Sequence, residues 1–130
     1  MPIPDFQTLM LPLLRLMADR QEKSIREATE PLAQELQVTS EDLATLLLSG
    51  QSVFRNRISW AKTYLSKAGL LTPTRRGYFR ITDRGIEVLG KAPGRIDIRF
   101  LEQFPEFGAF RQRTVQAEPE VASSEQRDEP

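Results

Sequence analysis

Apolar residues recur every three or four positions along much of the chain, which predicts a series of amphipathic helices. The first helix is expected from Asp5, a possible N-cap, to Arg20. Pro12 is costly in a helix interior, so this helix should either kink there or begin close to it. Its apolar positions are Phe6, Leu9, Met10, Leu13, Leu14 and Met17.

Two further helices are expected before Gly50. Ser24 and Glu27 have the spacing of a capping box, in which each side chain accepts a hydrogen bond from the other residue's backbone N–H. The helix that follows contains Pro31 and would bury Ile25, Ala28, Leu32 and Leu36. A shorter helix should begin at Thr39 or Ser40 and end at Gly50, with a core face of Leu43, Leu46 and Leu47.

A fourth helix is predicted from Ser52 to Ala68, with Gly69 as its left-handed cap. Its side chains separate into two arcs. The apolar arc consists of Val53, Phe54, Ile58, Trp60, Ala61, Tyr64, Leu65 and Ala68, with Arg57 among them. The polar arc consists of Arg55, Asn56, Ser59, Lys62, Thr63, Ser66 and Lys67. The helical spacing of Trp60 and Tyr64 favours core anchors over base-stacking platforms.

The segment after this helix predicts a β-hairpin and then a short helix. Two strand-like runs, Leu70 to Thr72 and Tyr78 to Thr82, bracket a turn that contains Arg75, Arg76 and Gly77. The tip of the hairpin should therefore be positively charged. The next helix is expected from Thr82 or Asp83 to about Leu89.

Several helices followed by a hairpin predict a mainly α-helical fold with a small β-hairpin, the winged helix-turn-helix, over residues 1–91. Residues 92–113 are interpreted as an extension that packs on this domain, with a strand-like alternation in RIDIRFLEQF and several phenylalanines. Residues 114–130 have no aromatic residue and many Glu, Ser and Pro, which predicts a disordered acidic linker. One domain with tails agrees with a length of 130 residues.

The composition argues against several kinds of chemistry. The chain has no cysteine and no histidine, so it lacks thiol nucleophiles, imidazole bases and the usual zinc ligands. Gln21-Glu22-Lys23 matches the short form of a nuclease motif, but a match of three residues is expected often by chance. We therefore expect no catalytic residue, metal or cofactor in this chain. The apolar runs are too short for a membrane span and no signal peptide is evident, which predicts a cytoplasmic protein.

The charges are balanced overall, with 18 basic and 18 acidic residues, but they are distributed unevenly. Residues 22–50 contain two basic and six acidic groups, a net charge of −4. Residues 50–91 contain nine basic and two acidic groups, a net charge of +7. The tail from Ala117 contains one basic and five acidic groups, again a net charge of −4. Positive charge concentrated in the region of the fourth helix and the hairpin indicates a polyanionic partner.

We expect that partner to be double-stranded DNA, with the fourth helix in the major groove and the hairpin along the backbone. The cations suit phosphates or guanine edges, and the short polar side chains suit bases. The expected contacts are Arg55, Asn56, Ser59, Lys62, Thr63, Ser66, Lys67, Arg75 and Arg76. Arg57 has two possible roles, an ion pair with Glu41 or Asp42 or a phosphate contact. Two alternatives stay open, a self-association or autoinhibitory module, including a homodimer, and a transcription regulator with one operator.

Five stretches of the chain also resemble, in order and spacing, the N-terminal domain of the Mrr family of restriction system proteins. The resemblance runs from about Phe6 to Phe110, and Asn56 to Ala61 is its most specific part. The stretches are FQTLMLPLLRLMAD, SIREATEPLAQEL, SVFRNRISWAKTYLSKAGLL, RRGYFRITDRGIEVL and IRFLEQFPEF.

The resemblance implies a function as well as a fold. Members of this family are bacterial type IV, methylation-dependent restriction endonucleases, which cut foreign DNA carrying modified bases. It implies a winged-helix domain that binds DNA and is joined by a linker to a C-terminal nuclease domain of the PD-(D/E)xK type. That nuclease domain would lie beyond residue 130, so no catalytic residue carries over to this chain.

Overall fold

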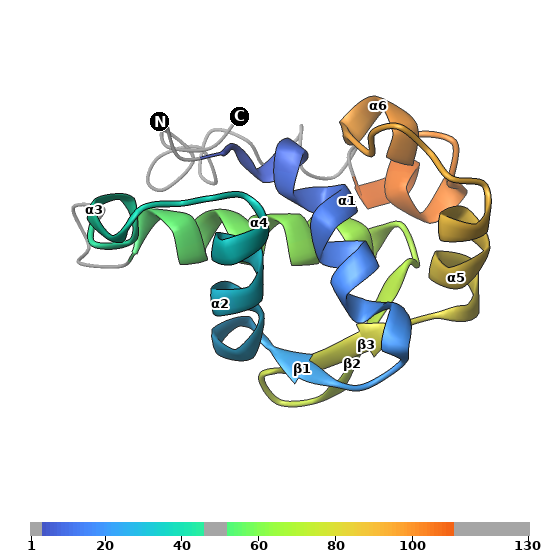
Figure 1. Cartoon of the computed structure of the whole chain (residues 1–130). Helices are drawn as coiled ribbons and strands as arrows, with labels where there is room; N and C mark the ends of the chain where they lie inside the picture. Colours follow the sequence, from blue (N-terminus) through green and yellow to red (C-terminus); the bar gives the residue numbers. More distant parts are fainter. Residues whose placement is uncertain (1–3, 46–51, 111–130) are drawn as a thin grey trace.

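The computed structural model describes residues 4–45 and 52–110, and it confirms the expected fold class, mainly α-helical with a small antiparallel sheet (Figure 1). The helices before the hairpin are α1 (Phe6–Leu16), α2 (Ile25–Glu35), α3 (Ser40–Leu43) and α4 (Val53–Lys67). The hairpin consists of β2 (Leu71–Arg75) and β3 (Tyr78–Ile81), and it is followed by α5 (Asp83–Gly90) and α6 (Ile98–Leu101). Within these residues no helix is long and apolar enough to cross a membrane.

Side-chain caps set the beginnings of the main helices, as their sequences predict. The Asp5 carboxylate accepts a hydrogen bond from the Thr8 backbone N–H at 2.7 Å, and α1 then continues through Pro12. Both hydrogen bonds of the capping box between Ser24 and Glu27 are formed at the start of α2. Thr39 caps α3, which ends at Leu43; the expected continuation through Leu46 and Leu47 lies outside the described residues.

The sheet contains a third strand in addition to the two of the predicted hairpin. Strand β1 (Lys23–Ser24) pairs antiparallel with β3, which gives the strand order β1-β3-β2. Two residues are too few to show the alternation that identifies a strand. An irregularity between Pro73 and Arg75 marks a β-bulge in the pairing of β2 with β3. We call β2, β3 and the turn between them, residues 71–81, the wing.

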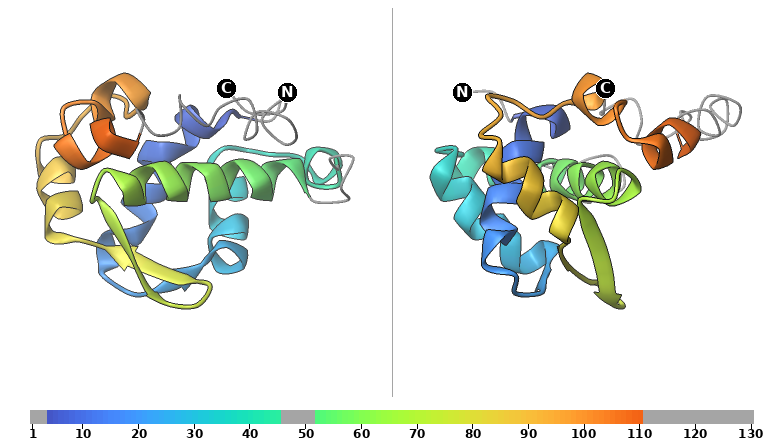
Figure 2. Two further views of the ribbon diagram at one scale, coloured as in Figure 1. Left: turned by 180° about the vertical axis from the view of Figure 1, so that it is seen from behind. Right: turned by 90° about the vertical axis from the view of Figure 1, so that its right-hand side faces the viewer.

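The core forms where α1 crosses α4 (Figures 1 and 2). Tyr64 of α4 is buried there, with its ring centroid 4.7 Å from that of Phe6 on α1. Trp60 is half-buried and lies edge-on to Tyr64 at 6.0 Å. The prediction that both aromatic residues anchor the core is confirmed for Tyr64, whereas Trp60 is only partly buried and packs against the edge of the core. The apolar arc of α4 therefore holds this helix in place, and the wing follows directly from its C-terminal end.

The extension after α5 belongs to the same core, but its expected strand is wrong. Residues 95–97 are not paired in a sheet, and α6 begins at Ile98 because the Asp97 carboxylate accepts a hydrogen bond from the Phe100 N–H. An N-cap of this kind outweighs a short alternation of apolar residues. Residues 105–110 are helical as well. Ile96, Leu101 and Phe107 are fully buried in the cluster that contains Phe6.

Arg84 of α5 contacts both the end of α4 and this extension. Its Nη1 donates to the carbonyl of Ala68, the C-cap of α4, at 2.8 Å. The same atom lies 3.0 Å from a carboxylate oxygen of Glu106, and the guanidinium lies 5.0 Å from the centroid of the Phe104 ring. One side chain thus contacts α4 and two positions of the extension. The Arg84 hydrogen bond also holds the pKa of Glu106 below its ordinary value of 4.5.

This lowered pKa predicts how stability depends on pH. A carboxyl group with a depressed pKa in the folded state stabilises the fold above its unfolded pKa and loses this effect as pH falls through the folded pKa. The melting temperature of the chain should therefore decrease below pH 4.5, and the decrease should be smaller in Glu106→Gln. Calorimetry between about pH 7 and about pH 3 measures both curves. Two parallel curves would contradict a contribution from the Arg84–Glu106 pair.

Candidate nucleic-acid interface

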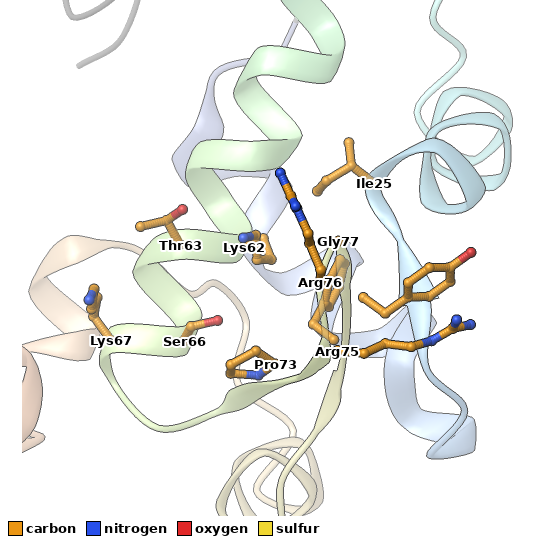
Figure 3. A pocket seen from close by; sticks show the side chains of 11 residues that line it. Ile25, Lys62, Thr63, Ser66, Lys67, Pro73, Arg75, Arg76 and Gly77 are labelled. Carbon is orange, nitrogen blue, oxygen red and sulfur yellow. The ribbon is translucent and has the colours of Figure 1, made fainter.

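A cleft of about 590 Å³ lies between the C-terminal half of α4 and the wing (Figure 3). Three features line it: polar residues of α4, the tip of the wing, and Ile25 at the start of α2. Six of the nine predicted contact residues line this cleft, and they are Lys62, Thr63, Ser66, Lys67, Arg75 and Arg76. We call this feature the helix–wing cleft. The sequence pattern thus identified most of the polar residues of the helix–wing cleft, although they come from two separate elements, α4 and the wing.

Two glycines give the chain the turns that shape this cleft. Gly69 has a φ of 83° at the end of α4, where its N–H donates to the carbonyl of Ser66 and the Leu70 N–H donates to Leu65. These bonds satisfy the hydrogen-bonding capacity of carbonyl groups at the end of α4. They also reverse the direction of the chain, so that β2 lies near α4. Gly77 has a φ of 82° in the turn of the wing. Because glycine adopts positive φ without steric cost, both reversals are encoded locally.

Three of the cations in the cleft have no acidic partner within the part of the chain that the structure describes. They are Lys62, Lys67 and Arg76, and none of them forms an ion pair in residues 4–45 or 52–110. The Lys62 ammonium lies 6.0 Å from the centroid of the Phe79 ring, and the Lys67 ammonium lies 5.5 Å from that of Phe110. Aromatic faces support a cation without neutralising it. The cleft is therefore a concentration of positive charge.

Arg75 differs from these three because its charge is already compensated. Its Nε and Nη2 both lie 3.0 Å from one carboxylate oxygen of Glu22, Oε2. The other oxygen, Oε1, accepts a hydrogen bond from the Thr74 hydroxyl at 2.6 Å. The Thr74 hydrogen bond and, after it, the Arg75 guanidinium hold the pKa of Glu22 below its ordinary value of 4.5. Glu22 therefore stays ionised at neutral pH.

The remaining predicted residues lie outside the cleft. Arg55 is exposed near the start of α4, where it lines a second hollow of about 430 Å³ between α2, α3 and α4. Ser59 is half-buried between the two hollows along the helix. Arg26 of α2 also lines the second hollow, although it is not among the nine predicted contact residues. Arg26 lies inside the capping box, between Ser24 and Glu27, and this place in the first turn of a predicted helix was the signal that could have found it.

One prediction for the start of α4 is corrected. Asn56 is only 6% exposed, so the expectation that it faces outward with the polar arc is wrong. Helix α4 contacts α2 and α3 as well as α1, so more of its circumference is covered than packing against a single helix predicts. Arg57 is half-buried, and its Nη1 donates to the Pro4 carbonyl at 3.4 Å. This hydrogen bond connects Arg57 to the segment before α1, and the two roles expected for its charge, an ion pair with Glu41 or Asp42 and a phosphate contact, stay predictions.

The short nuclease-like triplet is engaged in structural contacts. The Lys23 ammonium lies 2.9 Å from a carboxylate oxygen of Asp19, and Glu22 is held by Thr74 and Arg75. Within residues 4–45 and 52–110, no group of three or more Asp or Glu side chains is arranged to hold a metal ion.

The element order, the three-stranded sheet and the basic cleft define this chain as a winged helix-turn-helix domain. It belongs to the family described as the Mrr N-terminal domain, whose model matches residues 6–91. This match confirms the resemblance seen in the sequence.

A curated relative and the solved structures complete the comparison. The chain is 31% identical over 94 residues to the type IV methyl-directed restriction enzyme EcoKMrr of Escherichia coli strain K12. The aligned region covers 72% of this chain and 31% of the relative, so the chain spans about a third of that enzyme's length. No solved structure matches the chain.

Proposed function

We propose that this chain is the double-stranded DNA-binding domain of an Mrr-like restriction enzyme, and that it positions a C-terminal nuclease domain on foreign, methylated DNA. The observation that carries the proposal is the helix–wing cleft, where Lys62, Lys67 and Arg76 lie together without acidic partners in the described residues. An α-helix is about 10–12 Å wide, which suits a major groove of about 12 Å. The name of the curated relative, a methyl-directed restriction enzyme, supports DNA as the substrate.

Each part of the surface has its own role in this proposal. Lys62 and Lys67 of α4 and Arg76 of the wing bind phosphates and fix the domain on the duplex. Thr63 and Ser66 lie between the two lysines and approach base edges with short side chains that donate and accept hydrogen bonds. Arg55 near the start of α4 and Arg26 of α2, which line the second hollow, bind the opposite backbone strand. Because phosphate contacts contribute most of the binding free energy and do not depend on the base sequence, the domain binds many DNA sequences.

Binding of the 130-residue chain to one duplex, with and without methylated bases, tests this function over a series of salt concentrations. We expect both duplexes to bind with the same dependence on salt, because the slope counts phosphate contacts and these are independent of base modification. Tighter binding of the methylated duplex at every salt concentration would assign modification reading to this domain. A tight dimer that does not bind DNA at moderate salt would contradict the proposal and support the self-association alternative.

A further inference from the structure

The two arginines at the tip of the wing are adjacent in sequence but differ in what they contact. Figure 3 shows Arg76 extending from the turn toward α4 and Ile25, whereas Arg75 extends away from Lys62 and Lys67. Arg76 forms no ion pair in the described residues, whereas Arg75 is engaged by Glu22. Two neighbouring basic residues in a sequence suggest the same role for both. The different contacts of Arg75 and Arg76 indicate two different roles.

The contacts of Arg75 connect all three strands of the sheet. Arg75 on β2 is paired with Tyr78 on β3, and Tyr78 is paired with Ser24 on β1. The Arg75 guanidinium lies 3.8 Å from the centroid of the Tyr78 ring, and it reaches Glu22, which comes directly before β1. The Arg75 side chain is thus held on two sides, by the Tyr78 ring and by charge-assisted hydrogen bonds to the Glu22 carboxylate.

The β-bulge explains why two consecutive residues reach the same carboxylate. In a regular strand, neighbouring side chains point to opposite faces, so Thr74 and Arg75 would diverge. The irregularity between Pro73 and Arg75 breaks this alternation, and both side chains contact Glu22, one on each oxygen. Glu22, Thr74, Arg75 and Tyr78 therefore form one network, which we call the wing brace.

We propose that Arg75 is a positioning residue that braces the wing through Glu22 and Tyr78, and that Arg76 is the wing residue that contacts the DNA backbone. This proposal rests on the DNA-binding function proposed above. Leu71, Phe79 and Ile81 hold the base of the wing in the core, whereas residues 73–77 at its tip are exposed. The exposed tip of a hairpin has few contacts of its own, so it needs such a connection to present Arg76 in one place. Glu22 thus serves the site by fixing its geometry, although it carries the same sign of charge as DNA.

The test compares Arg75→Ala, Arg76→Ala and Glu22→Gln in the 130-residue chain, with Glu87→Gln as a control. Glu87 is exposed on α5, so this control removes one negative charge away from the brace. Two quantities are measured: backbone order parameters of the wing by NMR, without DNA, and the salt dependence of duplex binding. The first reports the brace alone, and the second counts phosphate contacts.

Arg76→Ala should reduce the slope of log K against log salt by about 0.9 and leave the wing ordered. Arg75→Ala should keep the wild-type slope, weaken binding, and lower the order parameters of the wing from about 0.85 toward about 0.6. Glu22→Gln retains every cation, yet it should loosen the wing and weaken binding relative to Glu87→Gln. Arg75 would instead be a direct contact if Glu22→Gln tightened binding, or if Arg75→Ala reduced the slope with the wing still ordered.

The two measurements also separate this inference from the proposed function. If the wild-type chain did not bind duplex DNA, the proposed function would fail. The order parameters of Arg75→Ala and Glu22→Gln would still decide whether the brace exists. A wing that stayed ordered in both variants would overturn the inference, whatever the result of DNA binding.

Discussion

A chain that ends at Lys91 is expected to lose its cooperative thermal unfolding transition, although residues 6–91 span the whole of the family match. The truncation removes Ile96, Leu101 and Phe107, which are fully buried in the core cluster that includes residues of α1 and α4. Burial of each such side chain stabilises a fold by about 1.5–3 kcal/mol, which gives roughly 5–9 kcal/mol for the three. A small domain is stable by only about 5–15 kcal/mol in total.

The loss extends beyond apolar burial, because the truncation also removes Glu106, the ion-pair partner of Arg84. A chain that ends at Phe110 is the matched control, since it keeps every one of these contacts. Circular dichroism at increasing temperature should show the wild-type transition for the control and none for the chain that ends at Lys91. A shared melting temperature for the two truncated chains would mean that the extension contributes little to the fold.

The triple variant Lys62→Ala, Lys67→Ala and Arg76→Ala is expected to bind duplex DNA on the order of 10² to 10³ times more weakly than the wild type, if each phosphate contact contributes roughly 1–1.5 kcal/mol. The three cations come from α4 and the wing but face one cleft. Their side chains are exposed or half-buried, so their removal should leave the melting temperature nearly unchanged. Fluorescence anisotropy with a labelled duplex measures the affinity.

A second triple variant controls for the loss of positive charge, and it also removes the ion pair between Arg95 and Asp97 at 3.4 Å. Lys91, Arg95 and Arg99 are exposed cations of the α5–α6 region, and none of them lines the helix–wing cleft. Replacing these three by alanine changes the net charge by the same amount. This control should bind DNA with close to wild-type affinity. Equal losses in the two variants would show that the domain attracts DNA through its overall charge and has no localised interface.

The main helices could be predicted from sequence because their signals are local. Asp5, Ser24 and Thr82 each cap a helix that begins where its apolar spacing begins. The expected strand in residues 92–113 was wrong because a cap at Asp97 outweighs a short alternation. Strand β1 could not be found because two residues show no period.

The cleft could be predicted in outline, because α4 and the wing each show their charges in sequence. Two features of this surface could not be predicted from the sequence. The burial of Asn56 depends on how α2 and α3 as well as α1 pack on α4, which a single-helix projection does not include. The pairing of Arg75 with Glu22 joins residues 53 positions apart through a β-bulge, and no sequence pattern indicates it. Long-range packing therefore decided which of the predicted residues remain available to a partner.

The salt dependence of duplex binding by the 130-residue chain tests the central claim, that the helix–wing cleft is a DNA-binding surface. Lys62, Lys67 and Arg76 in phosphate contact predict that the slope of log K against log salt is steeper in the wild type than in their triple alanine variant by about 2.7, at about 0.9 per contact. The triple variant of the α5–α6 region should keep the wild-type slope. A wild-type chain whose slope equals that of the cleft variant would contradict the claim.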